Sequence, residues 1–295
     1  MRIRFVCAGF VVIVAAAPAP VTAQSAIDTL VAVDPDTRLE VQQIHGDVTI
    51  GTWGRSAVRV VANVTERNRV RIRRNVSVLA IQDERPHGTP VDYTLTVPAA
   101  MDLVIHGVDT DITIVDTEGR VDAQTVKGDI HVRGGRTVIE LGSVQGKVDL
   151  TGARGSIEVQ SVNQGVVVSG ASGDVKASTV NGPIGLSRIT SKSVEGTSVN
   201  GGIRYDGTLS SDGWYRFSTH NGGIAVVVPP GTGAIVEVST FNGSLSASFP
   251  VSVGGLPVAG KPRDKQFRFT LGSGGARISL ESFNGSIRLV RSGEK

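Results

Sequence analysis

Residues 175–205 read VKASTVNGPIGLSRITSKSVEGTSVNGGIRY and hold two copies of the short unit that decides the fold. Each copy is Ser or Thr, then Val, then Asn-Gly, with alternating apolar and polar residues on both sides. Aligned on this unit, near-regular copies recur along the chain at Thr125–Gly128, Ser143–Gly146, Ser161–Gln164, Thr179–Gly182, Ser198–Gly201, Thr219–Gly222, Thr240–Gly243 and Ser282–Gly285. Successive copies are 18, 18, 18, 19, 21, 21 and 42 residues apart. A near-constant period of this size is the sequence signature of a stacked-repeat architecture.

The flanks of the unit predict two β-strands in each repeat. Six and four residues before the Asn position most copies carry apolar residues, such as Ile157 and Val159, with a polar residue such as Glu158 between them. Three and five residues after it the alternation returns, as in Ile184 and Leu186. Alternation with period two is typical of a half-buried strand. Each repeat is therefore predicted to be a strand, an Asn-Gly corner, a second strand and a looser Gly turn.

Two architectures fit this pattern, a meander of hairpins and a β-solenoid with one coil per repeat. Asn-Gly suits a hairpin turn because it tolerates positive φ. Each column of the alignment keeps its chemical type, however, as expected when residue i stacks on residue i+18 or i+21 of the next coil. Asn residues in one column can also form a ladder of side-chain amides. We predict an all-β, single-domain β-solenoid with coils of 18–21 residues.

The N-terminal residues predict export. Two arginines precede an apolar stretch from Val6 to Ala17, and Val21-Thr22-Ala23 forms a small-residue cleavage site, which is the pattern of a secretory signal peptide at 1–23. Cleavage would remove Cys7, the single cysteine, so neither a disulfide nor a Cys-ligated metal is expected. The remaining 28 basic and 27 acidic residues give a net charge of +1, which provides no general attraction to nucleic acid or anionic membrane. The expected location is the periplasm or the cell surface, with no transmembrane segment after cleavage.

Residues 24–97 depart from the regular repeat. They are predicted to form an N-terminal β region with degraded coils and a polar loop at 82–90. Strands are expected from Val58 to Val64 and from Val70 to Ile81, because both stretches are rich in β-branched residues.

Residues 98–291 are predicted to form the regular solenoid, with an insertion at 250–270. Glycines and prolines in the insertion imply a loop, and Phe267 and Phe269 predict a short strand near its end. The 37 glycines and the low aromatic content of 4% agree with an all-β chain with many turns.

Three features together carry a family resemblance. They are the Asn-Gly-x-Ile coils, the segment Gly46–Ile50 with Trp53 and then Val58-Arg59-Val60, and the strand Val91–Pro98 closed by Val-Pro. On these motifs the chain, from about Leu39 to Val290, resembles a bacterial family of secreted putative adhesins, domains of unknown function with a toast-rack-like β-solenoid. The resemblance implies an envelope or surface protein with a role in adhesion. The family has no established catalytic residues, so it implies none here.

Stacked carboxylates offer the best sequence argument for an enzyme. Glu140 and Glu158 occupy one outward column of adjacent coils, about 4.8 Å apart at strand spacing. That is near the separation of about 5–5.5 Å between the carboxyl groups of retaining glycosidases. The competing interpretation is a solvated charged face, because Lys176 and Glu195 continue the column and a flat ribbon has no concave pocket. We expect no catalytic residue.

No metal and no cofactor is predicted either. The Gly-Asp turns at Asp47, Asp129 and Asp174 offer one carboxylate per coil, whereas calcium takes six to eight oxygen ligands. No two of the five histidines stand at a metal-binding spacing. His220 takes the place of Val or Phe in a column interpreted as apolar, so it is predicted to be a core histidine.

Aromatic residues are concentrated after Arg204. Tyr215 and Phe217 fall on inward columns, and Phe241 and Phe283 fall at the corner. A thicker core near the C-terminus is the simplest explanation, and it suits the longer coils there.

Candidate surface contacts are Trp53, Arg69, Arg71, Arg73 and Trp214. The arginines share one face of a predicted strand, where they either protect a sheet edge or attract anionic envelope glycans or lipid head groups. Trp214 points outward and Trp53 lies beside two glycines; each is interpreted either as packing or as a contact with a sugar or a protein partner. Since no aromatic residues interleave with the arginines, nucleic acid is not expected as a partner.

The leading hypothesis is an exported, non-catalytic β-solenoid that acts as an adhesin-like interaction or scaffold module at the cell envelope. Its expected partner is a cell-envelope glycan or protein. One alternative is a polysaccharide-active β-helix enzyme that uses the stacked carboxylates Glu140 and Glu158. Another is an accessory protein of envelope-stress sensing.

Overall fold

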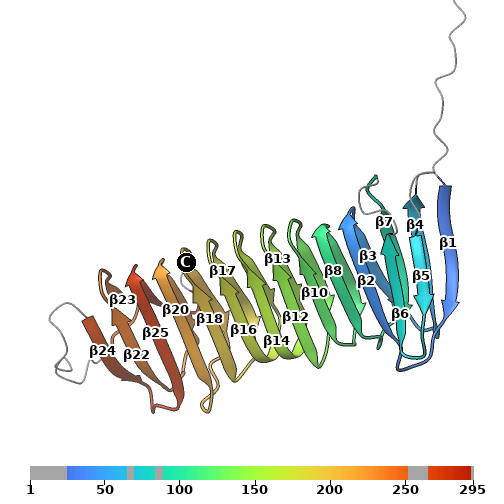
Figure 1. Ribbon diagram of the computed structural model, residues 1–295. Coiled ribbons are helices and arrows are strands. Elements are labelled where there is room, and N and C mark those ends of the chain that lie inside the picture. Colours follow the sequence, from blue (N-terminus) through green and yellow to red (C-terminus); the bar gives the residue numbers. More distant parts are fainter. Residues whose placement is uncertain (1–24, 65–69, 84–88, 252–264, 294–295) are drawn as a thin grey trace, which may run out of the picture.

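The computed structural model describes residues 25–64, 70–83, 89–251 and 265–293, so the predicted signal peptide lies outside the described residues. Within these ranges every regular element is a β-strand, and the strands form two sheets of 13 strands each (Figure 1). This confirms the all-β solenoid. No helix in the described part of the chain is long and apolar enough to cross a membrane.

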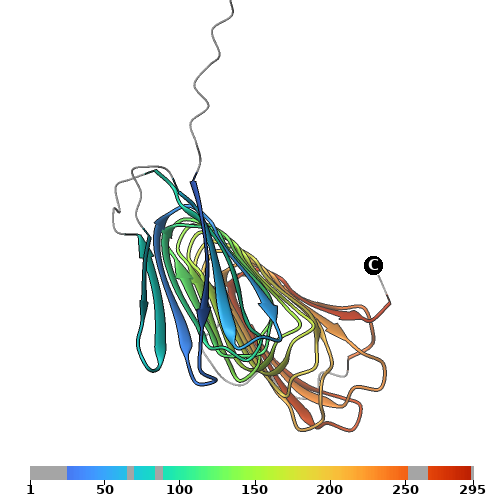
Figure 2. The same cartoon turned by 90° about the vertical axis from the view of Figure 1, so that its right-hand side faces the viewer.

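The two sheets lie face to face along the stack (Figure 2). Sheet A contains, in spatial order, β1 (Ser25–Ala32), β4 (Ala57–Val64), β7 (Asp92–Pro98), β3 (Val48–Trp53), β9 (Ile112–Thr117), β11 (Ile130–Gly134), β13 (Val148–Thr151), β15 (Val166–Ser169), β17 (Ile184–Ile189), β19 (Ile203–Gly207), β21 (Ile224–Val228), β26 (Ile287–Arg291) and β23 (Leu245–Ala247). Sheet B contains β24 (Lys265–Leu271), β22 (Ala234–Thr240), β25 (Ala276–Asn284), β20 (Trp214–Asn221), β18 (Ser193–Ser198), β16 (Ser172–Thr179), β14 (Arg154–Ser161), β12 (Val138–Ser143), β10 (Val121–Thr125), β8 (Leu103–Asp109), β2 (Arg38–His45), β6 (Val78–Asp83) and β5 (Val70–Arg74).

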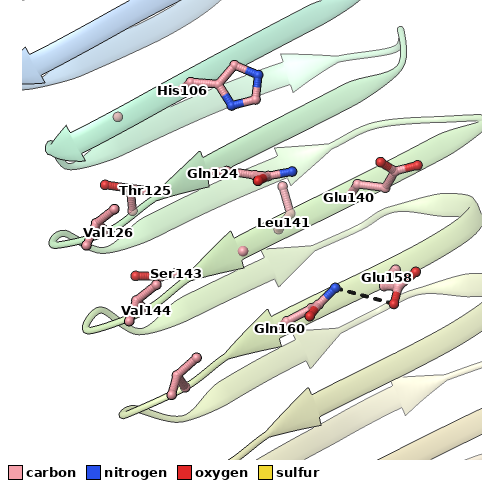
Figure 3. A pocket seen from close by; sticks show the side chains of 13 residues that line it. His106, Gln124, Thr125, Val126, Glu140, Leu141, Ser143, Val144, Glu158 and Gln160 are labelled. Carbon is pink, nitrogen blue, oxygen red and sulfur yellow. Dashed lines mark hydrogen bonds between the residues drawn. The ribbon is translucent and has the colours of Figure 1, made fainter.

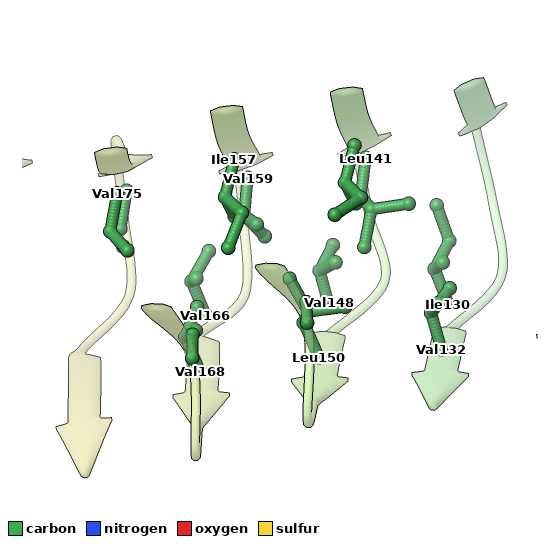
Figure 4. Packing of buried hydrophobic residues seen from close by; sticks show 14 of the residues in the cluster. Ile130, Val132, Leu141, Val148, Leu150, Ile157, Val159, Val166, Val168 and Val175 are labelled. Carbon is green, nitrogen blue, oxygen red and sulfur yellow. The ribbon is translucent and has the colours of Figure 1, made fainter. Parts of the chain in front are cut away.

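Each regular repeat forms one coil, with a strand in sheet B, a corner and a strand in sheet A. Neighbouring coils pair in parallel and in register, so that Val159 stands between Leu141 and Ala177, as predicted. The inward side chains of both sheets fill one continuous core, in which Val159 is fully buried (Figure 4). The alternating apolar residues of the repeat therefore form columns that run along the whole stack.

The corner unit is held by a hydrogen bond from each coil to the next. The Ser or Thr that begins the unit is buried, and its hydroxyl donates to a main-chain carbonyl of the neighbouring coil's corner. Ser161 Oγ, for example, lies 2.9 Å from the carbonyl oxygen of Gly146, and Thr219 Oγ1 lies 2.9 Å from that of Gly201. The hydroxyl is therefore satisfied without water, which explains why a small polar residue occupies a buried position in every repeat.

The glycine that ends the unit is needed because the backbones of neighbouring coils approach closely there. A hairpin turn would instead require a glycine with a positive φ angle. Gly182, Gly201 and Gly222 are not among the residues with positive φ. A Cβ at Gly182 would lie 2.1 Å from the carbonyl oxygen of Gln164, and one at Gly201 would lie 1.9 Å from that of Gly182. Gln164 occupies this position in one coil, so the fold can accommodate a side chain there at a cost in stability.

At the N-terminal end the coils are not stacked in chain order. The coil formed by β2 and β3 lies between the coil of β6 and β7 and the coil of β8 and β9. The strand predicted from Val70 to Ile81 is two antiparallel strands, β5 and β6, because the chain turns at residues 75–77, where the Asn75 amide donates to the Val78 carbonyl at 2.8 Å. Strand β6 continues to Asp83, into the region predicted as a loop.

The C-terminal end shows a similar exchange that the spacing of the repeats did not reveal. Strands β25 and β26 form the last coil in the sequence, yet they lie between the coil of β20 and β21 and the coil of β22 and β23. Strand β24 confirms the short strand predicted at Phe267 and Phe269. It pairs antiparallel with β22 and ends sheet B.

Two glycines three residues apart in the same coil provide a test of the close-approach argument. Gly182→Ala should destabilise the protein by about 1–3 kcal/mol, the usual cost of forcing atoms into a packed interior. Gly185→Ala should be neutral or stabilising by up to about 1 kcal/mol. Its Cβ would meet only Val167 Cγ2 at 3.9 Å, so the folded chain has room for it. The substitution also lowers the conformational entropy of the unfolded chain, which favours the folded state. Thermal melts followed by circular dichroism measure both. Equal melting temperatures for the two variants would contradict a steric role of the corner glycine.

Candidate functional site

The predicted contact residues do not form one site. Trp53 ends β3 in sheet A, Arg71 and Arg73 lie on β5 at the edge of sheet B, and Trp214 begins β20 near the other end of the stack (Figure 1). Arg69 lies outside the described residues. These side chains therefore lie at separate places on the surface.

Trp53 is held in place by its own turn. Its Nε1 donates to the Ala57 carbonyl at 2.7 Å, and the Arg55 guanidinium lies over the indole, 5.2 Å from the ring centroid. The side chain is half-buried. These contacts favour the packing interpretation of Trp53.

The arginines of β5 lie on an edge strand. Arg71 and Arg73 are exposed, and the following Arg74 forms an ion pair with Asp34 at 3.1 Å. Cationic side chains on an edge strand discourage pairing with another chain, so the position agrees with the edge-protecting interpretation.

The carboxylate column lies at a shallow hollow of about 410 Å³ on sheet B (Figure 3). Glu140 and Glu158 are register partners on β12 and β14, as predicted. Each faces a cation: Arg120 Nη2 lies 3.3 Å from Glu140, and Lys176 Nζ lies 3.0 Å from Glu158. The described residues around the hollow include no Trp, Tyr or Phe to hold a sugar ring. The pair is thus part of a surface charge network, and this geometry does not favour glycosidase chemistry.

A row of aspartates lies where the chain leaves the corner and enters sheet A. Each aspartate directly precedes the first inward residue of its strand in sheet A, and those inward residues are register partners. The row therefore contains, on adjacent coils and in spatial order, Asp92, Asp47, Asp111 and Asp129. Carboxylates in the row accept main-chain amides of the next coil: Asp111 Oδ1 lies 2.8 Å from the Asp129 nitrogen. Partial burial and the charges of Asp92 and Asp111 raise the pKa of Asp47 above its ordinary value.

The grouping of Asp174 with Asp47 and Asp129 was wrong. Asp174 lies on β16 in sheet B, opposite Ser156 and Ser193, whereas the other two lie on the sheet A side of the corner. All three follow a glycine, but they occupy different positions of the repeat. Across the described ranges, no three His, Cys, Asp or Glu side chains are placed to hold a metal ion.

The residue before each corner Asn points outward, and this overturns the prediction of a core histidine at His220. His220 is exposed, whereas Thr219 before it is 3% exposed. Strand alternation explains the difference, because the buried Ser or Thr is followed by a residue on the opposite face. The position forms a continuous line on the outer surface, exposed except at the half-buried Phe241 and named here the corner ridge: Val108, Val126, Val144, Val162, Val180, Val199, His220, Phe283 and Phe241 in spatial order.

The aromatic end of the corner ridge is a stack. Phe283 lies between His220 and Phe241, with ring centroids 4.7 Å apart on both sides and interplanar angles of 9° and 3°. Phe283 is 42% exposed. The prediction that Phe241 and Phe283 thicken the core is therefore wrong for Phe283. Tyr215 and Phe217 do lie inside and pack against Tyr205, with centroid distances of 5.7 and 5.2 Å.

Beside the corner ridge runs the predicted ladder of asparagine amides. Each Nδ2 donates to the Oδ1 of the neighbouring coil at 2.8–3.0 Å, along the series Asn163, Asn181, Asn200, Asn221, Asn284 and Asn242. The ladder is exposed and uncharged. It fixes the spacing of the ridge side chains from Val162 to Phe241 and gives that part of the ridge an uncharged polar border, whereas Asp109 and Lys127 follow Val108 and Val126.

The row of aspartates generates a prediction about pH. Since the folded-state pKa of Asp47 is raised, ionisation costs more in the folded chain than in the unfolded one. The stability that the protonated group contributes is present below the ordinary pKa of 3.8 and is lost as the pH rises through the folded value. Asp47→Asn should therefore stabilise the protein at pH 7, by up to about 1 kcal/mol because exposed charges interact weakly. At pH 3 the gain should vanish.

Melting temperatures of wild type and Asp47→Asn between pH 3 and pH 8 measure this effect. Asp122→Asn is the control, because Asp122 lies on the outer face of sheet B in register with Val104 and Glu140, away from the row of aspartates. A lower melting temperature for Asp47→Asn at pH 7 would show that the carboxylate charge is needed rather than tolerated.

No family model matches the chain, and no curated protein matches it. Among solved structures, a putative adhesin from Parabacteroides merdae is 7% identical, with 90% of this chain and 95% of that one covered and a TM-score of 0.46. A putative adhesin from Bacteroides fragilis is 11% identical, with coverages of 92% and 98% and a TM-score of 0.41. A putative cell adhesion protein from Clostridium sporogenes is 10% identical, with coverages of 92% and 100% and a TM-score of 0.23. Similarities this low do not bear on what this chain binds.

Proposed function

We propose that the protein is an exported, non-catalytic β-solenoid that serves as an adhesin-like interaction or scaffold module at the cell envelope. The observation that carries the proposal is the corner ridge. Its valines are each 37–43% exposed, and Phe283 is 42% exposed. Single exposed apolar side chains need no explanation, but a contiguous exposed apolar line marks an interaction surface.

The ridge has the dimensions of a contact for an extended partner. Nine positions at strand spacing span roughly 38 Å. The asparagine ladder on one side of the ridge carries no charge. Farther from the corner on sheet B, Arg120 is paired with Glu140 and Lys176 with Glu158. The ridge is thus a stiff and largely apolar line, and it suits an elongated envelope component.

Rigidity of the corner supports an interaction role. Every ridge residue is tied to its neighbours by main-chain hydrogen bonds that continue through the corner, such as the Asn181 amide to the Val162 carbonyl at 2.8 Å. Fixed side chains lose little conformational entropy on binding. A preorganised ridge can therefore bind with a modest contact area per coil.

Cosedimentation of the purified protein with isolated bacterial envelopes tests the proposal. In the ridge variant Val144→Lys/Val162→Glu/Val180→Lys, charges of alternating sign pair along the column, so the coils stay stacked while the apolar line is interrupted. We expect wild type to sediment with the envelopes and the ridge variant to lose at least about 90% of that binding, a loss of roughly 1.4 kcal/mol or more.

The matched control places the same alternating charges on the adjacent sheet face, as Gln160→Lys/Ser178→Glu/Thr197→Lys. It should sediment as wild type does. Equal sedimentation of the ridge variant and wild type would contradict the proposed contact. Turnover of an envelope glycan by wild type, lost in Glu140→Gln or Glu158→Gln, would instead support the polysaccharide-active enzyme.

A further inference from the structure

A second hollow, of about 340 Å³, lies on the outer face of sheet B near its C-terminal end. It is lined by Trp214, Arg277, Ser279, Ile235, Glu237 and Arg268. The hollow lies on a sheet face and not at the corner, so it is separate from the corner ridge. What it binds is therefore a question independent of the proposed function.

The exchange of coils builds this hollow. Because β25 lies between β20 and β22, Arg277 stands between Trp214 and Ile235 in one outward column. In the next outward column, Ser279 stands between Arg216 and Glu237. Serine is the smallest of these side chains, so it leaves a depression whose walls are the indole, the guanidinium groups and the carboxylate. Strand β24 adds the last wall, with Arg268 opposite Glu237.

The charges of the hollow do not cancel. Arg268 forms an ion pair with Glu237 at 3.5 Å. Arg277 is exposed, and in the described part of the chain it makes neither an ion pair nor a hydrogen bond through its side chain. Among the lining residues, two arginines thus face one carboxylate. Arg216, the outward neighbour of Ser279, lies beside the hollow and has Glu195 as its other register partner.

The aromatic wall is available to a ligand. Trp214 is 41% exposed, and no other aromatic ring stacks on it among the described residues. Indole presents a large amphipathic surface for an apolar face of a ligand, and its N–H is a donor. An unpaired guanidinium beside it can bind a carboxylate through two parallel hydrogen bonds. Glu237 and the Ser279 hydroxyl can accept hydrogen bonds from hydroxyl groups.

We propose that this hollow binds an acidic saccharide, a pyranose ring that bears a carboxylate, with the C–H face of the ring on Trp214 and the carboxylate on Arg277. A neutral sugar would leave Arg277 unpaired in the complex. A phosphate group would bring a second negative charge toward Glu237 and would make no use of the indole. A uronic acid residue satisfies the ring, the cation and the hydroxyl-accepting groups together.

Isothermal titration calorimetry with tetragalacturonate as the probe tests the assignment. The same tetrasaccharide with its carboxyl groups reduced to alcohols is the neutral comparison, and inorganic phosphate is the anion comparison. Wild type should bind tetragalacturonate at least about tenfold more tightly than either, since a charged contact and an aromatic contact each contribute at this level.

Trp214→Ala and Arg277→Gln should each weaken binding of tetragalacturonate by about tenfold or more. Arg288→Gln is the matched control, because Arg288 is exposed on β26 in the same coil but on sheet A. It should bind as wild type does. All three positions are on the surface, so melting temperatures should stay within a few degrees of wild type.

Equal affinity for the reduced tetrasaccharide, equal affinity for phosphate, or unchanged binding by Arg277→Gln would each overturn the assignment. So would the lack of any heat from millimolar tetragalacturonate with wild type. The ridge variant Val144→Lys/Val162→Glu/Val180→Lys should keep its affinity for tetragalacturonate. Failure of the saccharide site therefore leaves the envelope cosedimentation result standing, and the reverse is also true.

Discussion

The contact between successive corners is the constraint on which the rest of this structure depends. At most corners a buried hydroxyl reaches the main chain of the neighbouring coil, an asparagine amide bonds its equivalent, and a glycine lets the two backbones approach closely, as at Ser161, Asn181 and Gly182. At Gly182 and Gly201 the approach is too close for a Cβ atom. Because the corners cannot slide, every residue before and after them is held in register, and columns of like side chains follow. The core, the corner ridge and the saccharide hollow are all consequences of this register.

A stack of parallel coils has two open ends, and the chain closes them with antiparallel strands. Strands β1 and β4 extend sheet A beyond β7, β5 extends sheet B beyond β6, and β24 pairs with β22 at the other end. At both ends one coil is also placed out of chain order. An unprotected edge would recruit further strands. Another parallel coil cannot simply continue the stack where an antiparallel strand ends it. The outermost strands are β1 and β23 in sheet A and β24 and β5 in sheet B.

Much of this arrangement could be predicted from local pattern, and the exceptions have physical causes. Period-two alternation places Val159 inside and Trp214 outside correctly, because the pattern reports which face a side chain occupies. The same alternation, carried past the buried Thr219, would also have placed His220 outside. The valines of that column favour a core position, so hydrophobicity and strand alternation point to opposite faces there. The order of the last coils could not be predicted, since Asn284 stacks equally well on Asn221 or Asn242. The saccharide hollow depends on that order, so it was not visible in the sequence.

Removal of one whole coil tests most directly whether each repeat is a single stacked unit. Deletion of residues 144–161 joins Ser143 to Val162, removes β13 and β14, and leaves every column in register. Deletion of residues 144–152 removes β13 alone, so that two successive strands of sheet B follow one another without a corner. Circular dichroism melts of both variants provide the measurement. The account predicts that the 18-residue deletion folds and melts cooperatively with a modest loss of stability, whereas the nine-residue deletion aggregates or melts without cooperativity. Aggregation of the former and a cooperative melt of the latter would contradict it.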